Sequence, residues 1–269
     1  MNEELRRCDE LIQECSSCNF AVVPFSLSRA QLEDAALSFL EFLSLSSEEK
    51  GQWFFRVDPS NRGTSVGYRS QDRARGDTDT KEYFHYNKYA EDRFGPLLAQ
   101  QAPAFQRFMH HAREVYDHAE RCLEHTLHLW EEQFPGVLAR FFPSAQHPNF
   151  YLRFAKYPPR GRGATLAQAH YDRGACTLAI AQSAPGLRIG RNAESLREVW
   201  WEDQSALFFP GPVFHEITRP DIVPAWHDAR QIYSAPYRAP DVQRWVIMFF
   251  ADTVQMRNLS YEEAHTQKE

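Results

Sequence analysis

The chain has 269 residues, 43% hydrophobic, 25% charged and 14% aromatic, and its 36 acidic residues outnumber 30 basic ones for a formal net charge of −6. This composition is typical of a globular protein long enough to bury a sizeable core. The negative charge argues against a general nucleic-acid or anionic-membrane surface, and no apolar run approaches the roughly 18–20 residues that span a bilayer.

The chain begins with a charged, amphipathic stretch, MNEELRRCDELIQEC, which predicts a helix rather than a signal peptide. Five cysteines, with a lone CxxC at Cys15 and Cys18 and Cys8 nearby, do not form a disulfide or zinc pattern. We therefore expect reduced thiols and a cytoplasmic protein.

Residues 1–145 have a mostly helical pattern. Ser28 with Gln31 forms a capping box before apolar residues at helical spacing, and a second box, Ser46 with Glu49, opens a short helix. The Gly-, Arg-, Ser- and Asp-rich stretch 59–79 predicts a loop. A long helix is expected over about 104–134, and its apolar side chains define a buried face.

After Pro143 the pattern changes to short β-type runs bounded by Pro, Gly, Asp or Asn. The expected strands are 150–157, 176–182, 187–190, 198–202, 206–210, 214–218, 230–235 and 244–252. Their spacing is typical of an antiparallel sandwich or barrel. We expect an α+β chain in which a helical N-terminal half packs on a C-terminal β-barrel as one cooperative unit.

The sharpest chemical feature is His170-Tyr171-Asp172. On a strand, residues i and i+2 point to the same face, so His170 and Asp172 can converge on one point. With a distant second histidine they would form the facial triad that holds non-haem Fe(II) and leaves three coordination positions open. Alone, the His-x-Asp pattern is equally compatible with a structural hydrogen bond.

The surrounding motifs resemble the isopenicillin-N-synthase-like family of Fe(II)/2-oxoglutarate oxygenases. They comprise Tyr157-Pro158, His170-x-Asp172, Thr177-Leu178 and Pro185-Gly186-Leu187, and upstream the helix and turn FLEFLSLSSEEK, Gly67-Tyr68 and Lys81-Glu82-x-Phe84. The resemblance covers about residues 20–252. It implies a double-stranded β-helix (jelly-roll) barrel flanked by the N-terminal and long central helices. The expected organisation is a single domain over 1–269, with a mostly helical part at 1–145 and a jelly-roll core at 146–255.

The resemblance leaves two candidates for the second iron-binding histidine. His227 lies 57 positions after His170 and follows Gly211 and Thr218 in the family's order, whereas His215 lies only 45 positions after His170. We therefore expect His170, Asp172 and His227 as the metal ligands. His215 would then lie on an intervening strand, one hairpin from the metal.

Arg244 opens the apolar strand RWVIMFF and resembles the arginine that binds the distal carboxylate of 2-oxoglutarate in this family. A guanidinium suits that role because it offers two parallel donors and keeps its charge when buried. Tyr157 is a second candidate for contacting this cosubstrate. Two departures from the family pattern concern the cosubstrate more than the metal: Val246 replaces the family's serine, and Ala155 its asparagine. The gap from His227 to Arg244 also implies a longer hairpin at YSAPYRAPD.

The family resemblance implies an oxygenase that uses Fe(II), 2-oxoglutarate and O2 to hydroxylate, desaturate or cyclise a small molecule. Candidate substrate-binding residues are Tyr68, Arg69, Tyr83, Phe84 and Tyr86, with a basic cluster at Arg69, Arg73 and Arg75. These residues could equally be a loop packed on the barrel. The leading alternative is a 2-oxoglutarate-independent Fe(II) oxidase of the isopenicillin N synthase type. A metal-free jelly-roll binding protein and a regulator acting on nucleic acid or protein are weaker alternatives.

Overall fold

The structure is a computed structural model that describes residues 3–56, 65–71, 80–144, 147–218, 222–232 and 244–253. Its helices are α1 (Glu3–Cys18), α2 (Arg29–Leu43), α3 (Ser47–Gly51), α4 (Lys88–Leu98), α5 (Pro103–Glu131), α6 (Val137–Phe141), the 3-10 turn η2 (Ala193–Ser195) and α7 (Pro212–Thr218). Its strands are β1 (Ala21–Pro24), β2 (Phe54–Arg56), β3 (Ser65–Gln71), β4 (Lys81–Tyr86), β5 (Asn149–Tyr157), β6 (Thr165–His170), β7 (Cys176–Gln182), β8 (Leu187–Gly190), β9 (Arg197–Glu198), β10 (Ser205–Pro210), β11 (Trp226–Arg230) and β12 (Arg244–Asp252).

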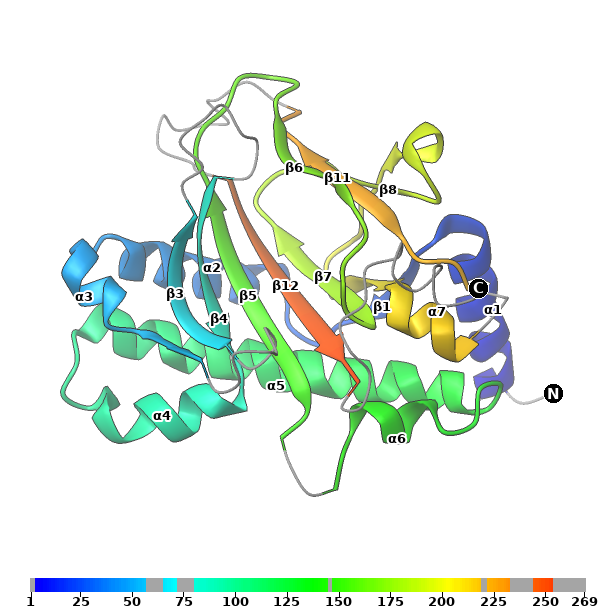
Figure 1. Cartoon of the computed structure of the whole chain (residues 1–269), viewed down its shortest axis with the longest axis horizontal. Helices are drawn as coiled ribbons and strands as arrows, with labels where there is room; N and C mark the ends of the chain where they lie inside the picture. Colours follow the sequence, from blue (N-terminus) through cyan, green and yellow to red (C-terminus); the bar gives the residue numbers. More distant parts are fainter. Residues whose placement is uncertain are drawn as a thin grey trace, which may run out of the picture.

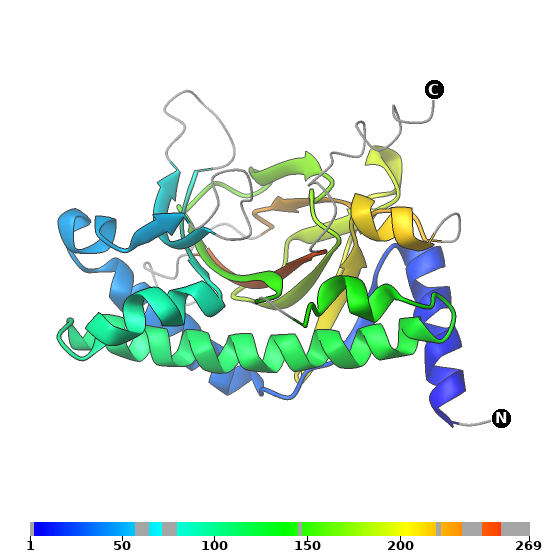
Figure 2. The same cartoon turned by 60° about the horizontal axis from the view of Figure 1, so that its bottom comes forward.

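The described strands form two antiparallel sheets rather than one closed barrel. The large sheet has the order β1-β10-β7-β12-β5-β4-β3-β2, and the small sheet has the order β6-β11-β8-β9 (Figure 1). Figure 2 shows three layers, with α5 running along one side, the large sheet behind it and the small sheet beyond. The fold is therefore α+β, with one face of the large sheet covered by helices and the other turned towards the small sheet.

The helical layer is held by an aromatic core. Phe39 and Phe42 on α2 contact Phe108 on α5, and Phe108 in turn contacts Phe84 on β4 and Phe154 on β5. These five rings are fully buried. Each pair adds roughly 0.5–1.5 kcal/mol to the stabilisation from burial alone. The core therefore covers the side of the large sheet that faces the helices, its outer face. The side that faces the small sheet is its inner face.

Both predicted capping boxes are confirmed, with Ser28 and Gln31 opening α2 and Ser46 and Glu49 opening α3. The long helix is also confirmed, with α5 spanning Pro103–Glu131 and every predicted core side chain buried. The apolar positions recur on one face over several turns, which is the most reliable helix signal in a sequence.

Three short motifs from the family resemblance meet in one network. The Lys50 ammonium and the Tyr68 hydroxyl both donate to Glu82 Oε1, at 3.1 and 2.7 Å, and Lys156 reaches Glu82 Oε2 at 3.2 Å. The Lys50 side chain is only 9% exposed. These motifs thus join α3, β3, β4 and β5.

Several element predictions are wrong. Residues 65–71 lie within the predicted loop 59–79 but form strand β3, where Gly67 has φ +97° and the neighbouring Tyr68 N–H donates to the Trp53 carbonyl. Residues 214–218 belong to helix α7, because Pro212 opens a helix and Val213, Phe214 and Ile217 pack at helical spacing. Strand β9 ends at Glu198, before the tryptophans of 198–202.

Of the predicted strand 230–235, only Arg230 is in a strand, as the last residue of β11; residues 231–232 are outside any strand, and 233–235 are not described. The hairpin expected at 233–241, Arg73, Arg75 and the last two residues of the predicted core lie outside the described residues, as does the side chain of Cys8. Cys15 and Cys18 form no disulfide among the described residues.

Candidate metal centre

His170 and His227 face each other across the small sheet. They are register partners in the β6–β11 pair, and their ring centroids lie 4.5 Å apart. Strand pairing therefore brings together two histidines that are 57 positions apart in the chain.

Asp172 completes the cluster from the irregular segment that follows β6, and not from the strand itself as the i, i+2 argument assumed. Its Oδ1 lies 3.5 Å from His170 Nε2 and 3.7 Å from His227 Nε2. Its Oδ2 accepts a hydrogen bond of 2.7 Å from the Thr177 hydroxyl on β7. Thr177 therefore fixes the carboxylate so that one oxygen points between the two imidazoles.

Backbone carbonyls orient both imidazoles. His170 Nδ1 lies 2.7 Å from the Gln168 carbonyl, and His227 Nδ1 lies 3.1 Å from that of Ala225. A carbonyl can only accept, so each Nδ1 carries the proton in the neutral ring and each Nε2 keeps its lone pair. The donors Nε2, Nε2 and Oδ1 thus converge as a set of three, and the possible ligand atoms of these residues all lie within 4.8 Å of one another.

The ionised Asp172 and the neutral His227 suit metal binding, whereas the raised pKa of His170 means that a proton competes with a metal at that ring. Burial alone would raise the pKa of Asp172, but His227, His170 and Thr177 hold it well below its usual range. Burial lowers the pKa of His227, which keeps that imidazole neutral, and Asp172 opposes this effect only in part. Burial also acts to lower the pKa of His170, but the hydrogen bond and charge of Asp172 outweigh it and raise the pKa.

The cluster is open on one side. The side chain of His170 is 48% exposed, whereas those of Asp172 and His227 are 15% and 5% exposed. Phe209 packs against His227, with ring centroids 5.0 Å apart. A ligand can therefore approach from the His170 side while the opposite side is closed by apolar groups.

His215 lies outside this cluster. It sits on α7 rather than on the expected strand, and its Nδ1 contacts the Ile222 carbonyl. The structure thus groups His227, and not His215, with His170 and Asp172.

Arg244 is a buried cation, 5% exposed, at the start of β12. Its Nη1 donates to the carbonyls of Pro185 and Arg230 at 2.8 and 2.9 Å, and its Nη2 donates to Gln182 Oε1 at 3.1 Å. Its Nε has no partner, and no carboxylate in the described part of the chain lies within ion-pairing distance. Buried charges in proteins are normally paired, so this guanidinium has the surroundings of an anion-binding group.

Tyr157 and Gln182 lie on the strands beside Arg244. Tyr157 is its register partner on β5, and Gln182 on β7 is the register partner of Val246. The Gln182 Nε2 atom is buried and has no hydrogen-bond partner within the described ranges. Among the described residues, two buried donors, Arg244 Nε and Gln182 Nε2, are therefore left unsatisfied near Val246.

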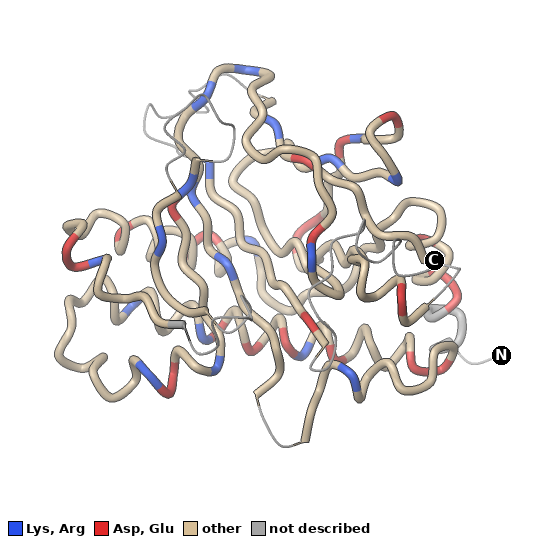
Figure 3. The backbone as a smooth tube through the Cα atoms, in the orientation of Figure 1, with Lys and Arg blue, Asp and Glu red and all other residues tan. Residues whose placement is uncertain are grey.

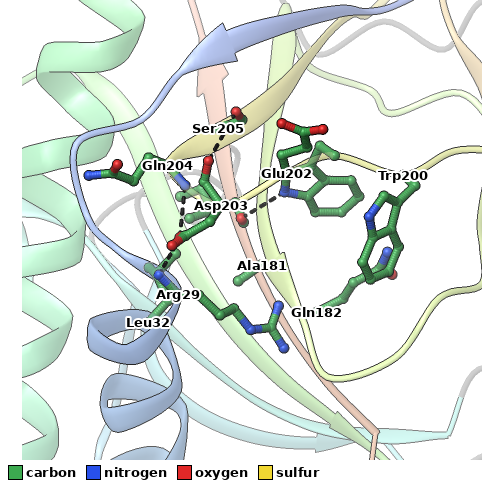
Figure 4. A pocket seen from close by; sticks show the side chains of 11 residues that line it. Arg29, Leu32, Ala181, Gln182, Trp200, Glu202, Asp203, Gln204 and Ser205 are labelled. Atoms are coloured by element: carbon green, nitrogen blue, oxygen red, sulfur yellow. Dashed lines mark hydrogen bonds between the residues drawn. The ribbon is translucent and has the colours of Figure 1, made fainter.

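Gln182 also lines a separate cavity of about 440 Å³ between the start of α2 and the strands β7 and β10. Figure 4 shows Arg29, Trp200 and Asp203 around it. None of the triad residues lines this cavity.

The predicted substrate-binding residues divide between the two faces of the large sheet. Tyr68 contacts Glu82 and Phe42, Phe84 is fully buried among phenylalanines, and Tyr86 donates to Glu91, so these three belong to the helix side. Tyr83 and Arg69 are register partners on the opposite, inner face. Tyr83 packs there with Tyr157, Ala155, Leu166 and Val246.

The sequence did not single out three inner-face residues: Thr177 as a hydrogen-bond partner, His85 and Arg153. The signal for Arg153 was present, because Arg153, Ala155 and Tyr157 alternate along one strand and so share a face.

The chain matches no family model and no curated protein. Among solved structures it resembles a protein of the 2OG-Fe(II) oxygenase family from Caulobacter crescentus, with 22% identity, a TM-score of 0.71 and coverage of 99% of this chain and 90% of that one. It also resembles a full-length Neurospora crassa protein solved in complex with alpha-KG (16% identity, TM-score 0.73, 94% and 82% coverage).

A third structure is the 2-oxoglutarate complex of dioxygenase for auxin oxidation 1 from Arabidopsis thaliana, with 13% identity, a TM-score of 0.73 and coverage of 97% and 92%. All three likenesses extend over nearly the whole chain. The expected resemblance is thereby confirmed at the level of structure: this chain has the fold of the 2OG-Fe(II) oxygenases.

Proposed function

We propose that this protein is a non-haem Fe(II)- and 2-oxoglutarate-dependent oxygenase that oxidises a small molecule. The observation that carries the proposal is a pair of sites in one fold: three converging ligand atoms, and a buried arginine without an anion. In this proposal 1–269 is a single domain, 1–145 is its mostly helical part, and strands β5 to β12 of the two sheets form the jelly-roll core over 146–255.

His170, Asp172 and His227 would hold the iron on one side and leave positions open towards the exposed side of His170. Two neutral imidazoles and one carboxylate suit Fe(II), and the carbonyl and Thr177 contacts pre-orient all three ligands. When bound, Fe(II) and 2-oxoglutarate supply the O2-dependent oxidation, in which 2-oxoglutarate is converted to succinate and CO2.

Arg244 would bind the distal carboxylate of 2-oxoglutarate through its free Nε and the second hydrogen of Nη2. Gln182 Nε2 would donate to the same carboxylate in place of the missing serine hydroxyl, and Tyr157 borders the site. These unsatisfied donors favour the 2-oxoglutarate-dependent reaction over the Fe(II) oxidase alternative, because an enzyme without 2-oxoglutarate would leave a buried cation unpaired.

The substrate would be a small molecule that reaches the open side of the triad together with O2. Solved structures with this fold include the Neurospora crassa protein with alpha-KG and thymine, and JOX2 with 2OG, Fe and JA, and their ligands support a small-molecule substrate. In the described residues no helix is long and apolar enough to cross a membrane. We place the protein in the cytoplasm and propose no nucleic-acid partner.

The proposal is tested by supplying purified protein with Fe(II), 2-oxoglutarate and O2 and measuring succinate. Wild-type protein should form succinate slowly even without substrate, and only when the metal is present. The Asp172→Ala variant should form none, because it lacks one ligand of three. Succinate formation by Asp172→Ala at the wild-type rate would refute the site, and its absence from wild type would favour the oxidase alternative.

A further inference from the structure

Arg153 lies on the inner face of the large sheet, on strand β5, which pairs with β12. Its guanidinium sits over three aromatic rings, at 4.6 Å from the centroid of Phe250, 5.2 Å from that of Tyr83 and 5.7 Å from that of Tyr151. Tyr151 in turn stacks on Phe250 with centroids 4.8 Å apart and an angle of 14°. The rings stabilise the cation through their π faces and offer no acceptor to its in-plane N–H groups.

His85 fixes the orientation of this guanidinium. Arg153 Nε donates to His85 Nε2 over 2.9 Å, and His85 is buried. Burial, and then the positive charges of Arg153, Arg69 and Lys81, hold the pKa of His85 well below its ordinary value. His85 is therefore a neutral acceptor, and the contact uses the Nε side of Arg153.

The other edge of Arg153 has no hydrogen-bond partner among the residues that the structure describes. In the described ranges, no carboxylate or carbonyl accepts from its Nη1 or Nη2. These two groups form a planar fork that matches the two oxygens of a carboxylate. The aromatic rings beside the fork would contact the carbon skeleton of the same molecule.

This fork lies close to the triad. Phe250, which Arg153 covers, is the register partner of Thr177, and the Thr177 hydroxyl binds Asp172. Because β12 separates β5 from β7, Arg153 and Thr177 are attached to strands about 10 Å apart. A small molecule bound at the fork can therefore extend to the open side of the triad.

The charges on this face favour an anion. Arg69 and Lys81 belong to the same inner face as Arg153, and Figure 3 shows basic positions along β3, β4 and β5. Among the described residues of strands β3, β4, β5 and β12, the inner face has one acid, Asp252 at the far end of β12. An incoming carboxylate thus meets net positive charge.

We propose that Arg153 is the substrate-binding residue for a carboxylate, and that the substrate class is a small monocarboxylate with an aromatic or apolar body. The rings of Tyr83, Tyr151 and Phe250 hold that body, and His85 is a positioning residue for Arg153. The inference rests on the proposed function for the oxidation of the bound molecule, but not for its binding.

The test uses phenylacetate, 3-phenylpropanoate and hexanoate, each compared with its uncharged amide, in calorimetric titrations of the metal-free protein. At least one acid should bind wild type more tightly than its amide does. In Arg153→Gln the affinity for that acid should fall about 10- to 100-fold, the range expected for hydrogen bonds to a charged group, with little change for the amide. Arg107→Gln, an exposed arginine on α5, is the control for the loss of one positive charge.

Arg244→Gln is the matched control, because it removes a different buried arginine of the inner face. The acid should bind Arg244→Gln as it binds wild type, whereas 2-oxoglutarate, titrated with Zn(II) present, should lose affinity in Arg244→Gln and keep it in Arg153→Gln. Arg153→Lys keeps the charge but not the planar fork, and it should also lose the preference for acid over amide. This variant replaces Arg153→Gln in the test if Arg153→Gln does not fold.

The proposal is overturned if no acid in the panel binds better than its amide, or if the preference is lost in Arg244→Gln and kept in Arg153→Gln. Loss of 2-oxoglutarate binding in Arg153→Gln would instead make Arg153 a cosubstrate anchor and also overturn it. If wild type binds the acid through Arg153 but never binds 2-oxoglutarate, the proposed function fails and the carboxylate site stands.

Discussion

At the scale of single residues, Asp172 links the two histidines of the candidate metal centre. Its Oδ1 lies between the two imidazoles, and its Oδ2 accepts a hydrogen bond from Thr177. The hydrogen bond therefore orients the carboxylate so that Oδ1 points towards both histidines. The sequence indicated the residue types through the His-x-Asp spacing. The hydrogen bond from Thr177 was not predictable, because it depends on how β7 lies against the irregular segment after His170.

The assignment of the third ligand is tested by two single variants. His227→Ala removes one of three converging donors and should abolish stoichiometric Fe(II) binding. His215→Ala should leave iron binding nearly intact, because His215 is engaged on α7 with the Ile222 carbonyl. Iron content of the two purified variants decides between them, and the reverse pattern would show that His215 is the ligand.

The buried carboxyl of Asp252 leads to a second prediction, on how stability depends on pH. It is 6% exposed, and burial, with a smaller contribution from the charge of Asp172, raises its pKa to about 7 while the Ala175 N–H opposes the shift. In the unfolded chain the pKa of this carboxyl is about 3.9. Between the two pKa values the native state binds more protons than the unfolded state, so stability falls as the pH rises.

Asp252→Asn keeps an oxygen for the Ala175 N–H but cannot ionise. It should be more stable than wild type at pH 8 by on the order of 2–4 kcal/mol, and the gain should disappear near pH 4. Denaturant unfolding of metal-free protein across this range measures it, with the exposed Asp34→Asn as control. A gain that grows towards low pH would contradict the buried, protonated carboxyl.

At the scale of elements, the turn before β8 positions the arginine anchor. Gly186 has φ +141°, and a Cβ there would lie 2.1 Å from the Arg230 carbonyl oxygen and 2.3 Å from Arg244 Nη1. The Pro-Gly-Leu motif therefore has a physical role, because the glycine leaves room for the guanidinium that donates to the Pro185 carbonyl.

Gly186→Ala should displace Arg244 and weaken 2-oxoglutarate binding about 10- to 100-fold, equivalent to roughly 1.4–2.8 kcal/mol of strain. Fe(II) binding should persist, since the triad is on other elements. Gly161→Ala, where a Cβ would meet nothing within 4 Å, is the control. Equal loss of 2-oxoglutarate affinity in both variants, or none in Gly186→Ala, would contradict the role of the turn.

The elements also show what a sequence can and cannot predict. The capping boxes and the buried face of α5 were predictable, because they depend on local spacing. Residues 214–218 were assigned wrongly because a short apolar run fits a strand and a helix equally well. The meeting of Arg153 with His85 and Phe250 depends on the register of β4, β5 and β12, and register is fixed by packing across the sheet.

The same reasoning explains the mixed outcome for the predicted substrate residues. Tyr83 and Phe84 are neighbours in the chain, but they lie on opposite faces of β4. Tyr83 is on the inner face, and Phe84 is in the core under the helices. The sequence predicted that this strand borders the site, but it did not specify which alternate residues face it.

At the scale of the whole molecule, the first half of the chain completes the large sheet. Strands β3 and β4 extend the sheet from β5, and Glu82 joins Lys50, Tyr68 and Lys156 across α3 and three strands. The helical layer and the sheet with the chemistry are therefore expected to unfold together.

Glu82→Gln should lower the free energy of unfolding by about 1–3 kcal/mol, because it leaves the nearly buried Lys50 ammonium without its counter-charge, while the partial exposure of Glu82 limits the loss. Denaturant unfolding measures the change. Glu41→Gln, which breaks the exposed pair with Arg107, should change it by less than about 0.5 kcal/mol. Equal effects from both variants would contradict the coupling of the two parts.

The most direct test of the central claim is an anaerobic titration of the protein with Fe(II) and then 2-oxoglutarate, following the visible charge-transfer band of the chelate. The account predicts that the band develops with one iron per chain in wild type and in Arg107→Gln. It should be absent in Asp172→Ala, and in Arg244→Gln it should require about 30- to 4,000-fold more 2-oxoglutarate, the effect of losing about 2–5 kcal/mol from a buried charge pair. Iron bound by wild type without any band at saturating 2-oxoglutarate, or an unchanged band in Arg244→Gln, would contradict it.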